Sequence, residues 1–161
     1  MAKKQRKPVS QAPQIRVREE NHKRTLYEME CISNPKEIGK IEVFLKKINR
    51  RARLDDGTFY RLFVSSTEAV NNGILHGNKS DPRKKVCISC SCNSDTITVR
   101  VKDEGNGFDP STIPNPLDDQ NLLKESGRGI FLIRSMMDKV NFQMTENGTI
   151  IEMVIDLKRL K

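Results

Sequence analysis

The pattern of apolar and polar residues along the chain predicts alternating strands and helices. Apolar residues with a period of two predict strands at 25–33, 86–92, 96–103, 140–144 and 149–157. Apolar residues at helical spacing predict helices at 35–53, 57–76 and 129–140. This order of elements predicts an α+β fold, a two-layer sandwich in which helices cover one face of a mixed or antiparallel sheet.

One segment interrupts this pattern, from Glu104 to Gly129. It is rich in Gly, Pro, Asn, Asp and Ser, and it is long for a loop in a compact domain. Loops of this length usually have a function of their own. We therefore expect a lid over a binding site, at roughly Phe108 to Ser126.

The length of 161 residues and a hydrophobic content of 35% fit a single globular domain that needs no disulfide or structural metal. No apolar run is long enough to cross a membrane, and the basic N-terminus lacks the apolar core of a secretory signal. The expected location is the cytoplasm, with no membrane partner.

The formal net charge of +8 is concentrated at the N-terminus. Residues 1–24 hold eight basic residues and two glutamates, a net charge of +6, which leaves +2 for the rest of the chain. This distribution predicts a disordered basic tail at 1–24 and a domain at 25–161. Nucleic acid is not expected as a partner of the domain, although a basic tail can touch RNA, DNA or an acidic protein.

The four cysteines are Cys31, Cys87, Cys90 and Cys92. The spacing of Cys87 and Cys90 matches a C-x-x-C motif, but both lie in a predicted strand, where this spacing sends them to opposite faces. One metal ion would not easily reach both, and a structural zinc site needs four ligands. We expect reduced cysteines buried in the core.

Three clusters carry candidate chemistry, and the first is SSTEAVNNGILHGN at 65–78. Glu68 and Asn72 are four residues apart in a predicted helix, so they share a face. A carboxylate beside an amide oxygen suits a general base and a ligand for a hard cation. The pair alone also fits an ordinary solvated helix face.

The second cluster is DEGNGFDP at 103–110, directly after a predicted strand. Asp103 can accept a hydrogen bond from an exocyclic amine, while Gly105 and Gly107 permit turns that a Cβ would block. An ordinary glycine turn is the alternative.

The third cluster is ESGRGIFLI at 125–133, where a glycine-rich loop enters a helix at Gly127, Arg128, Gly129 and Ile130. Backbone N–H groups at such a helix start can bind phosphate, although a plain helix start has the same pattern. Neither the P-loop motif nor the dinucleotide-binding motif G-x-G-x-x-G after a strand is present.

The order and spacing of the three clusters resemble the gyrase/histidine-kinase ATP-binding superfamily, over roughly residues 25–157. Within it, TEAVNNGILHG and GRGIFLIRSMMDKV are most similar to the small anti-sigma-factor serine/threonine kinases of bacterial partner-switching systems. The resemblance implies the Bergerat-type ATP-binding fold, with ATP and Mg²⁺ as ligands.

The resemblance also implies a role for each position. Asn72 would coordinate Mg²⁺, and Asp103 would receive the amino group of adenine. Gly105 and Gly107 would shape the base pocket, and Gly127, Arg128, Gly129 and Ile130 would hold the phosphates. Glu68 would be the general base for phosphoryl transfer.

The expected activity is therefore ATP-dependent phosphorylation of a small antagonist protein by an anti-sigma-type regulator. A sigma factor or an analogous regulator would be the other partner, and a homodimer is also implied. The alternative is a non-catalytic switch in which ATP binding alone controls a partner. Glu68 favours the kinase, whereas Glu125 favours the switch, because family members often carry an arginine there.

Overall fold

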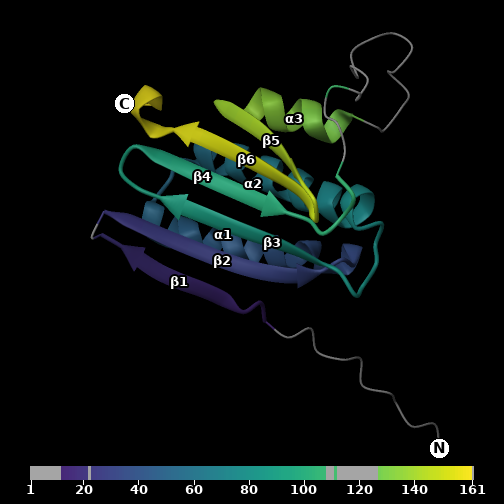
Figure 1. Cartoon of the computed structure of the whole chain (residues 1–161). Coiled ribbons are helices and arrows are strands. Elements are labelled where there is room, and N and C mark those ends of the chain that lie inside the picture. The colour runs from purple at the N-terminus through teal and green to yellow at the C-terminus, as the bar shows by residue number, and fades with distance from the viewer. Residues whose placement is uncertain (1–11, 22, 108–110, 112–126, 161) are drawn as a thin grey trace, which may run out of the picture.

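The computed structural model describes residues 12–21, 23–107, 111 and 127–160. Its sheet has six strands in the order β1-β2-β3-β4-β6-β5, and every neighbouring pair is antiparallel (Figure 1). The strands are β1 (Ile15–Glu20), β2 (Arg24–Ile32), β3 (Lys85–Cys92), β4 (Thr96–Lys102), β5 (Lys139–Thr145) and β6 (Gly148–Asp156). The predicted lid, Phe108 to Ser126, lies almost entirely outside the described residues.

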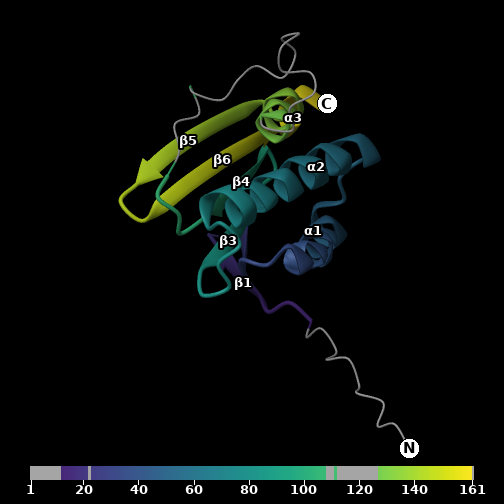
Figure 2. The same ribbon diagram turned by 90° about the vertical axis from the view of Figure 1, so that its right-hand side faces the viewer.

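The helices lie together on one face of this sheet (Figure 2). They are α1 (Gly39–Ala52), α2 (Asp56–Asn72) and α3 (Arg128–Met136), with short 3-10 helices at Pro35–Ile38 and Leu157–Leu160 and a π-helix at Gly73–Gly77. The α+β sandwich predicted from the sequence is confirmed, and the choice between a mixed and an antiparallel sheet is resolved as antiparallel.

Local signals set the ends of the first two helices. The side chain of Asn34 accepts a hydrogen bond from the backbone nitrogen of Lys36 at 3.0 Å. Asp55 caps α2 by accepting from the backbone nitrogen of Thr58 at 2.9 Å. Such caps pair N–H groups that have no partner within the helix. Arg53, in a left-handed conformation with φ of 49°, ends α1.

The core lies between the sheet and the helices. Alternate residues of the strands are buried, for example Ile88 and Met153, and they face buried residues of the helices such as Phe44, Leu62 and Ile133. Full burial of one such side chain contributes about 1.5–3 kcal/mol. This packing fixes the register of the sheet and therefore the position of every strand end.

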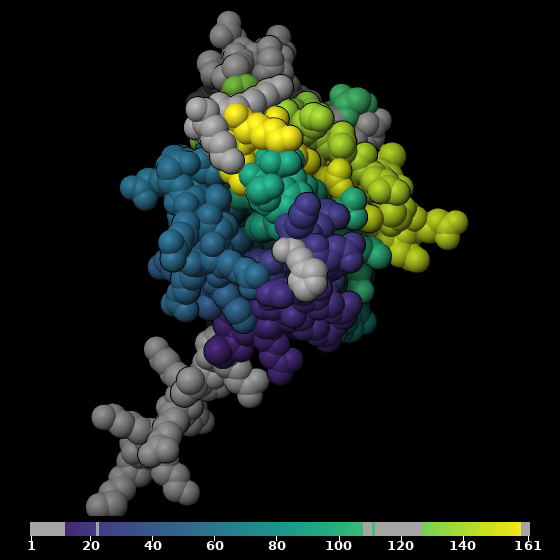
Figure 3. All heavy atoms as spheres, turned by 90° about the vertical axis from the view of Figure 1, so that its left-hand side faces the viewer, coloured from purple at the N-terminus to yellow at the C-terminus, as the bar shows by residue number. Residues whose placement is uncertain are grey.

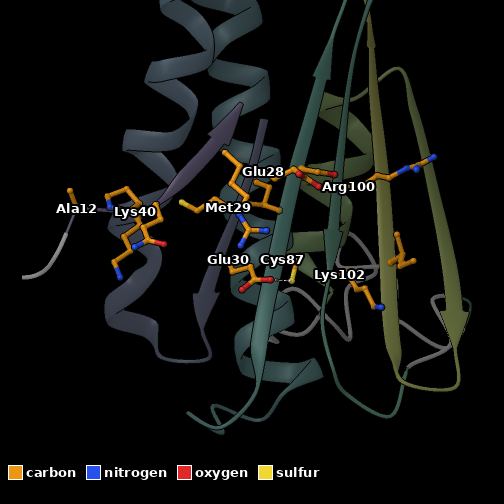
Figure 4. Close-up of a pocket in the computed structure, with 14 residues that line it drawn as sticks. Ala12, Glu28, Met29, Glu30, Lys40, Cys87, Arg100 and Lys102 are labelled. Carbon is orange, nitrogen blue, oxygen red and sulfur yellow. Dashed lines mark hydrogen bonds between the residues drawn. The ribbon is translucent and has the colours of Figure 1, made fainter. Parts of the chain in front are cut away.

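The other face of the sheet is polar. The register aligns one row of open-face residues across five strands: Arg16, Glu28, Ser89, Arg100 and Glu152. A cavity of about 490 Å³ lies along this face (Figure 4).

The N-terminal boundary of the domain lies earlier than the sequence predicted. Ile15–Glu20 forms β1, pairs with β2 and packs Ile15 against the core, and Glu19 makes a 2.7 Å ion pair with Arg51. The tail prediction is wrong for this segment, because charges interrupt its apolar alternation, as is common in edge strands. The tail residues 1–11 lie outside the described residues.

The cysteine prediction is correct in part. All four are without disulfides, but only Cys31 and Cys90 are buried, whereas Cys87 and Cys92 are half-exposed. Cys87 points to the open face of the sheet, and Cys92 is the last residue of β3. The strand geometry that separates Cys87 from Cys90 is confirmed.

Candidate functional site

The three clusters meet at one end of the sheet, on the right in Figure 1. The C-terminus of α2, the end of β4, the turn between β5 and β6 and the N-terminus of α3 all lie there. The antiparallel register places the end of β4 beside the start of β6, because Lys102 pairs with Ile150.

The first and third clusters are in direct contact. A Cβ atom on Gly129 would lie 2.7 Å from Oε2 of Glu68 and 3.3 Å from Nδ2 of Asn72. A side chain at this position would displace the Glu68 carboxylate, so the first turn of α3 lies close against the carboxylate and the amide that share a face of α2. Glu68 and Asn72 are both half-buried.

The side chain of Asn72 has an unusual environment. Its Nδ2 atom is buried, and the described residues offer it no hydrogen-bond partner. Oxygen and nitrogen of an amide have nearly the same shape, so rotation of the side chain would place Oδ1 at the same point. A buried amide without a protein partner fits a ligand that completes its coordination.

A π-helix connects the first cluster to the second. It begins directly after Asn72, and the backbone nitrogen of Asn78 donates to the carbonyl of Gly73 at 2.8 Å. The wider turn of the π-helix brings Gly77 against Asp103. A Cβ atom added to Gly77 would lie 2.6 Å from Oδ2 of Asp103. Turns of this kind occur frequently at functional sites.

Asp103 is 4% exposed, and only one of its two carboxylate oxygens accepts hydrogen bonds from the described residues. Oδ1 accepts hydrogen bonds from the backbone nitrogens of Gly105 at 2.9 Å and Thr149 at 3.2 Å. Oδ2 receives no hydrogen bond from the part of the chain that the structure describes. This oxygen of a buried residue is therefore open to a hydrogen bond from a ligand N–H group.

The remaining glycines of the second cluster shape the chain beside Asp103. Gly105 is buried against the backbone of Gly77, and Gly107 has a φ of 77° and lies near Met144. These residues lead the chain from β4 past the carboxylate toward the segment outside the described residues.

The N-terminus of α3 has the features of an anion site. Gly127 precedes the helix with a φ of 90°, and no side chain caps this end within the described residues. The first-turn N–H groups lack helical partners and attract negative charge. The side chain of Arg128 is exposed beside them, whereas the Ile130 side chain is buried in the core and anchors the helix.

The structure adds two residues to the site to which the sequence analysis assigned no role. Thr149 follows the turn between β5 and β6, and its Oγ1 atom is buried with no partner among the described residues. Its backbone forms two hydrogen bonds with Asp103. The second residue is Gly77, which lies against the carboxylate of Asp103. Both contacts depend on segments that are distant in the sequence, so no local motif reveals them.

Arg61 fixes α3 against α2 at the other end of the two helices. Its Nε atom donates to the carbonyl of Met136 at 2.6 Å, and its guanidinium lies 3.1 Å from the carboxylate of Asp138. Arg61 and Glu68 are seven residues apart, so they lie on one side of α2. The contact at Gly129 is thus held by two attachments along the interface of the helices.

Comparisons with known proteins agree with this geometry. The model of the histidine kinase-like ATPase domain matches residues 31–155. The anti-sigma F factor of Oceanobacillus iheyensis is 35% identical over 111 residues, which cover 67% of this chain and 75% of that protein. Serine-protein kinase RsbW of Bacillus subtilis is 28% identical over 132 residues, which cover 76% and 81%.

The chain therefore belongs to the histidine kinase-like ATPase domain family, and within it to the anti-sigma-factor kinases. The resemblance inferred from the three clusters is confirmed, and the domain implies ATP binding. Across the described residues, no helix is both long and apolar enough to cross a membrane.

Proposed function

We propose that this protein is an ATP-dependent serine/threonine protein kinase and anti-sigma-type regulator, which phosphorylates a small antagonist protein. The observation that carries the proposal is the contact of Gly129 with Glu68 and Asn72. This contact brings together a carboxylate, an amide that can bind a metal and a helix start that can bind an anion, which are groups that phosphoryl transfer can use.

Asp103 and Thr149 form the base-binding end of the site. Oδ1 of Asp103 accepts from the backbone, which leaves Oδ2 as an acceptor for the amino group of adenine, and the buried Oγ1 of Thr149 can donate or accept. Together they present a polar edge that suits a heterocycle with one exocyclic amine.

Asn72 and the first turn of α3 form the phosphate end. The buried amide of Asn72 is a suitable ligand for Mg²⁺. The described residues contain no group of three or more carboxylate, histidine or cysteine side chains that could hold a metal. Mg²⁺ usually takes substrate phosphates as its other ligands.

Glu68 is the general base of the proposed reaction. Bound ATP–Mg²⁺ supplies the phosphoryl group, and Glu68 Oε2 accepts the proton of the serine or threonine hydroxyl. The carboxylate is half-buried and lies against Gly129, so it is held beside the phosphate end of the site.

The alternative is a non-catalytic switch in which ATP binding sets the affinity for a partner. Glu125 supports it, since a carboxylate two residues before Gly127 adds negative charge close to the expected phosphates. In either case the proposed partners are an antagonist protein and a sigma factor or analogous regulator. A homodimer and a cytoplasmic location are part of the same proposal.

Capture of partners in the presence of ATP or ADP, followed by mapping of phosphorylated residues, tests the function. We expect a small protein that gains phosphate on one serine or threonine after incubation with ATP. Binding that depends on ATP, with no phosphate on any captured protein, would replace the kinase by the switch.

A further inference from the structure

A second cluster of reactive groups lies at the opposite end of the sheet. Cys90 and Cys92 occupy alternate positions of β3, and their sulfur atoms are 3.6 Å apart in hydrogen-bond contact. Cys92 lines a cavity of about 280 Å³ together with Lys23, Tyr27 and Arg51. Figure 3 shows this end of the molecule, where β1 and β2 (purple) lie beside the end of α1 (blue).

This cluster is separate from the proposed nucleotide site. Cys92 pairs with Ile97 at the start of β4, whereas Asp103 follows the end of that strand. At about 3.3 Å per residue, the two sites are roughly 20 Å apart.

The two thiols of the pair differ in their tendency to ionise. Cys90 is 0% exposed, and the hydrogen bond between the two sulfur atoms, together with burial, raises the pKa of its thiol well above the usual value. The same hydrogen bond stabilises the thiolate of Cys92 and lowers the pKa of that thiol. Cys92 lines the cavity whereas Cys90 is fully buried, so Cys92 is the member of the pair that a reagent can reach. A thiolate is the nucleophile in such reactions.

Cys87 provides an internal comparison on the open face of the sheet. It is half-exposed like Cys92, but its sulfur lies 3.9 Å from Oε1 of Glu30 (Figure 4). Burial and the carboxylate of Glu30 raise the pKa of the Cys87 thiol. Burial also raises the pKa of Cys31 to about 11. Similar exposure therefore does not imply similar reactivity.

We propose that Cys92 is a modification site that forms a mixed disulfide with an anionic low-molecular-weight disulfide. The Cys92 thiolate attacks one sulfur of the reagent and forms a new S–S bond with it. The original S–S bond breaks, and the other half leaves as a thiolate that takes a proton from water. Cys92 is oxidised and the leaving half is reduced, so the exchange balances without another reactant.

The walls of the cavity explain the preference for an anionic reagent. Lys23 and Arg51 contribute positive charge. Arg51 is partly neutralised by its ion pair with Glu19 at 2.7 Å, so Lys23 contributes most of the net attraction. Oxidised glutathione, which carries several carboxylates, is a suitable probe.

The experiment uses the full chain, reduced, desalted and incubated with oxidised glutathione at neutral pH. Intact mass and peptide mapping should show one adduct, located on Cys92, and the Cys92→Ser variant should show none. Cys87→Ser should react like the wild type. An adduct mainly on Cys87, or a mass loss of two hydrogens that indicates a Cys90–Cys92 disulfide, overturns the proposal.

Two variants at position 90 test the hydrogen bond itself. Cys90→Ala removes the hydrogen-bond partner of the Cys92 thiolate and should slow formation of the adduct relative to the wild type. Cys90→Ser keeps a donor and should react faster than Cys90→Ala. Circular dichroism confirms that each variant is folded. Equal rates in both variants and the wild type would show that Cys90 does not activate Cys92.

Discussion

The carboxylate of Asp103 holds the backbone with one oxygen and presents the other to a ligand, so its two simplest substitutions should have different effects. In Asp103→Asn, the amide oxygen can still accept from the nitrogens of Gly105 and Thr149. Its NH₂ group replaces Oδ2 and cannot accept from adenine. We expect a nearly unchanged fold and weaker binding of ATP.

The expected size of each effect follows from these bonds. Loss of one hydrogen bond to a buried charged group should weaken ATP binding by about 1–3 kcal/mol, roughly 5–150-fold. Asp103→Ala should in addition leave two buried N–H groups unpaired, at about 1–3 kcal/mol each. The free energy of unfolding should then fall by about 2–6 kcal/mol in this variant only.

Calorimetric titration with ATP–Mg²⁺ and urea unfolding of both variants measure the two effects. Unchanged ATP affinity in Asp103→Asn would show that Asp103 supports the backbone and does not contact the base. Equal loss of stability in both variants would show that the two oxygens are not divided between backbone and ligand.

Three other substitutions give independent tests. Gly129→Ala should abolish phosphoryl transfer, because its Cβ would lie 2.7 Å from the carboxylate of the proposed base, whereas Gly39→Ala, with open space around it, should have wild-type activity. Asn72→Ala should remove the enhancement of ATP binding by Mg²⁺, and equal enhancement in titrations of both proteins would place the metal elsewhere. The side-chain hydrogen bond from Arg83 lowers the pKa of Asp81 to about 2, so its stabilising effect should be complete above the usual aspartate pKa and lost as pH falls toward 2. Acid unfolding of Asp81→Asn should lack this component, and identical acid profiles would contradict it.

Much of the fold follows from local pattern. Helical spacing and caps located α1 and α2, and the alternation of residues located β2 to β6, because each signal comes from neighbouring residues. The edge strand β1 escaped detection, since only Ile15 packs against the core and charged residues dominate its sequence. Its strand conformation depends on pairing with β2.

The candidate site shows the same division between local and distant signals. The three clusters are visible as motifs, and the structure brings Glu68, Asn72, Asp103 and Gly129 together. The role of Thr149 is visible only through the pairing of β4 with β6, which no local pattern specifies. The proposed reactivity of Cys92 likewise depends on its contact with Cys90 and on a cavity lined by residues from several elements.

The central claim is that Glu68 is the base of a protein kinase. Glu68→Gln keeps the size of the side chain and removes its basicity. Transfer of ³²P from ATP to the captured partner should fall by about 10²–10⁴-fold, the usual contribution of general acid–base catalysis, while ATP affinity stays near that of the wild type. Transfer at the wild-type rate in Glu68→Gln would contradict the assignment of Glu68, and absence of transfer in the wild type would contradict the kinase itself.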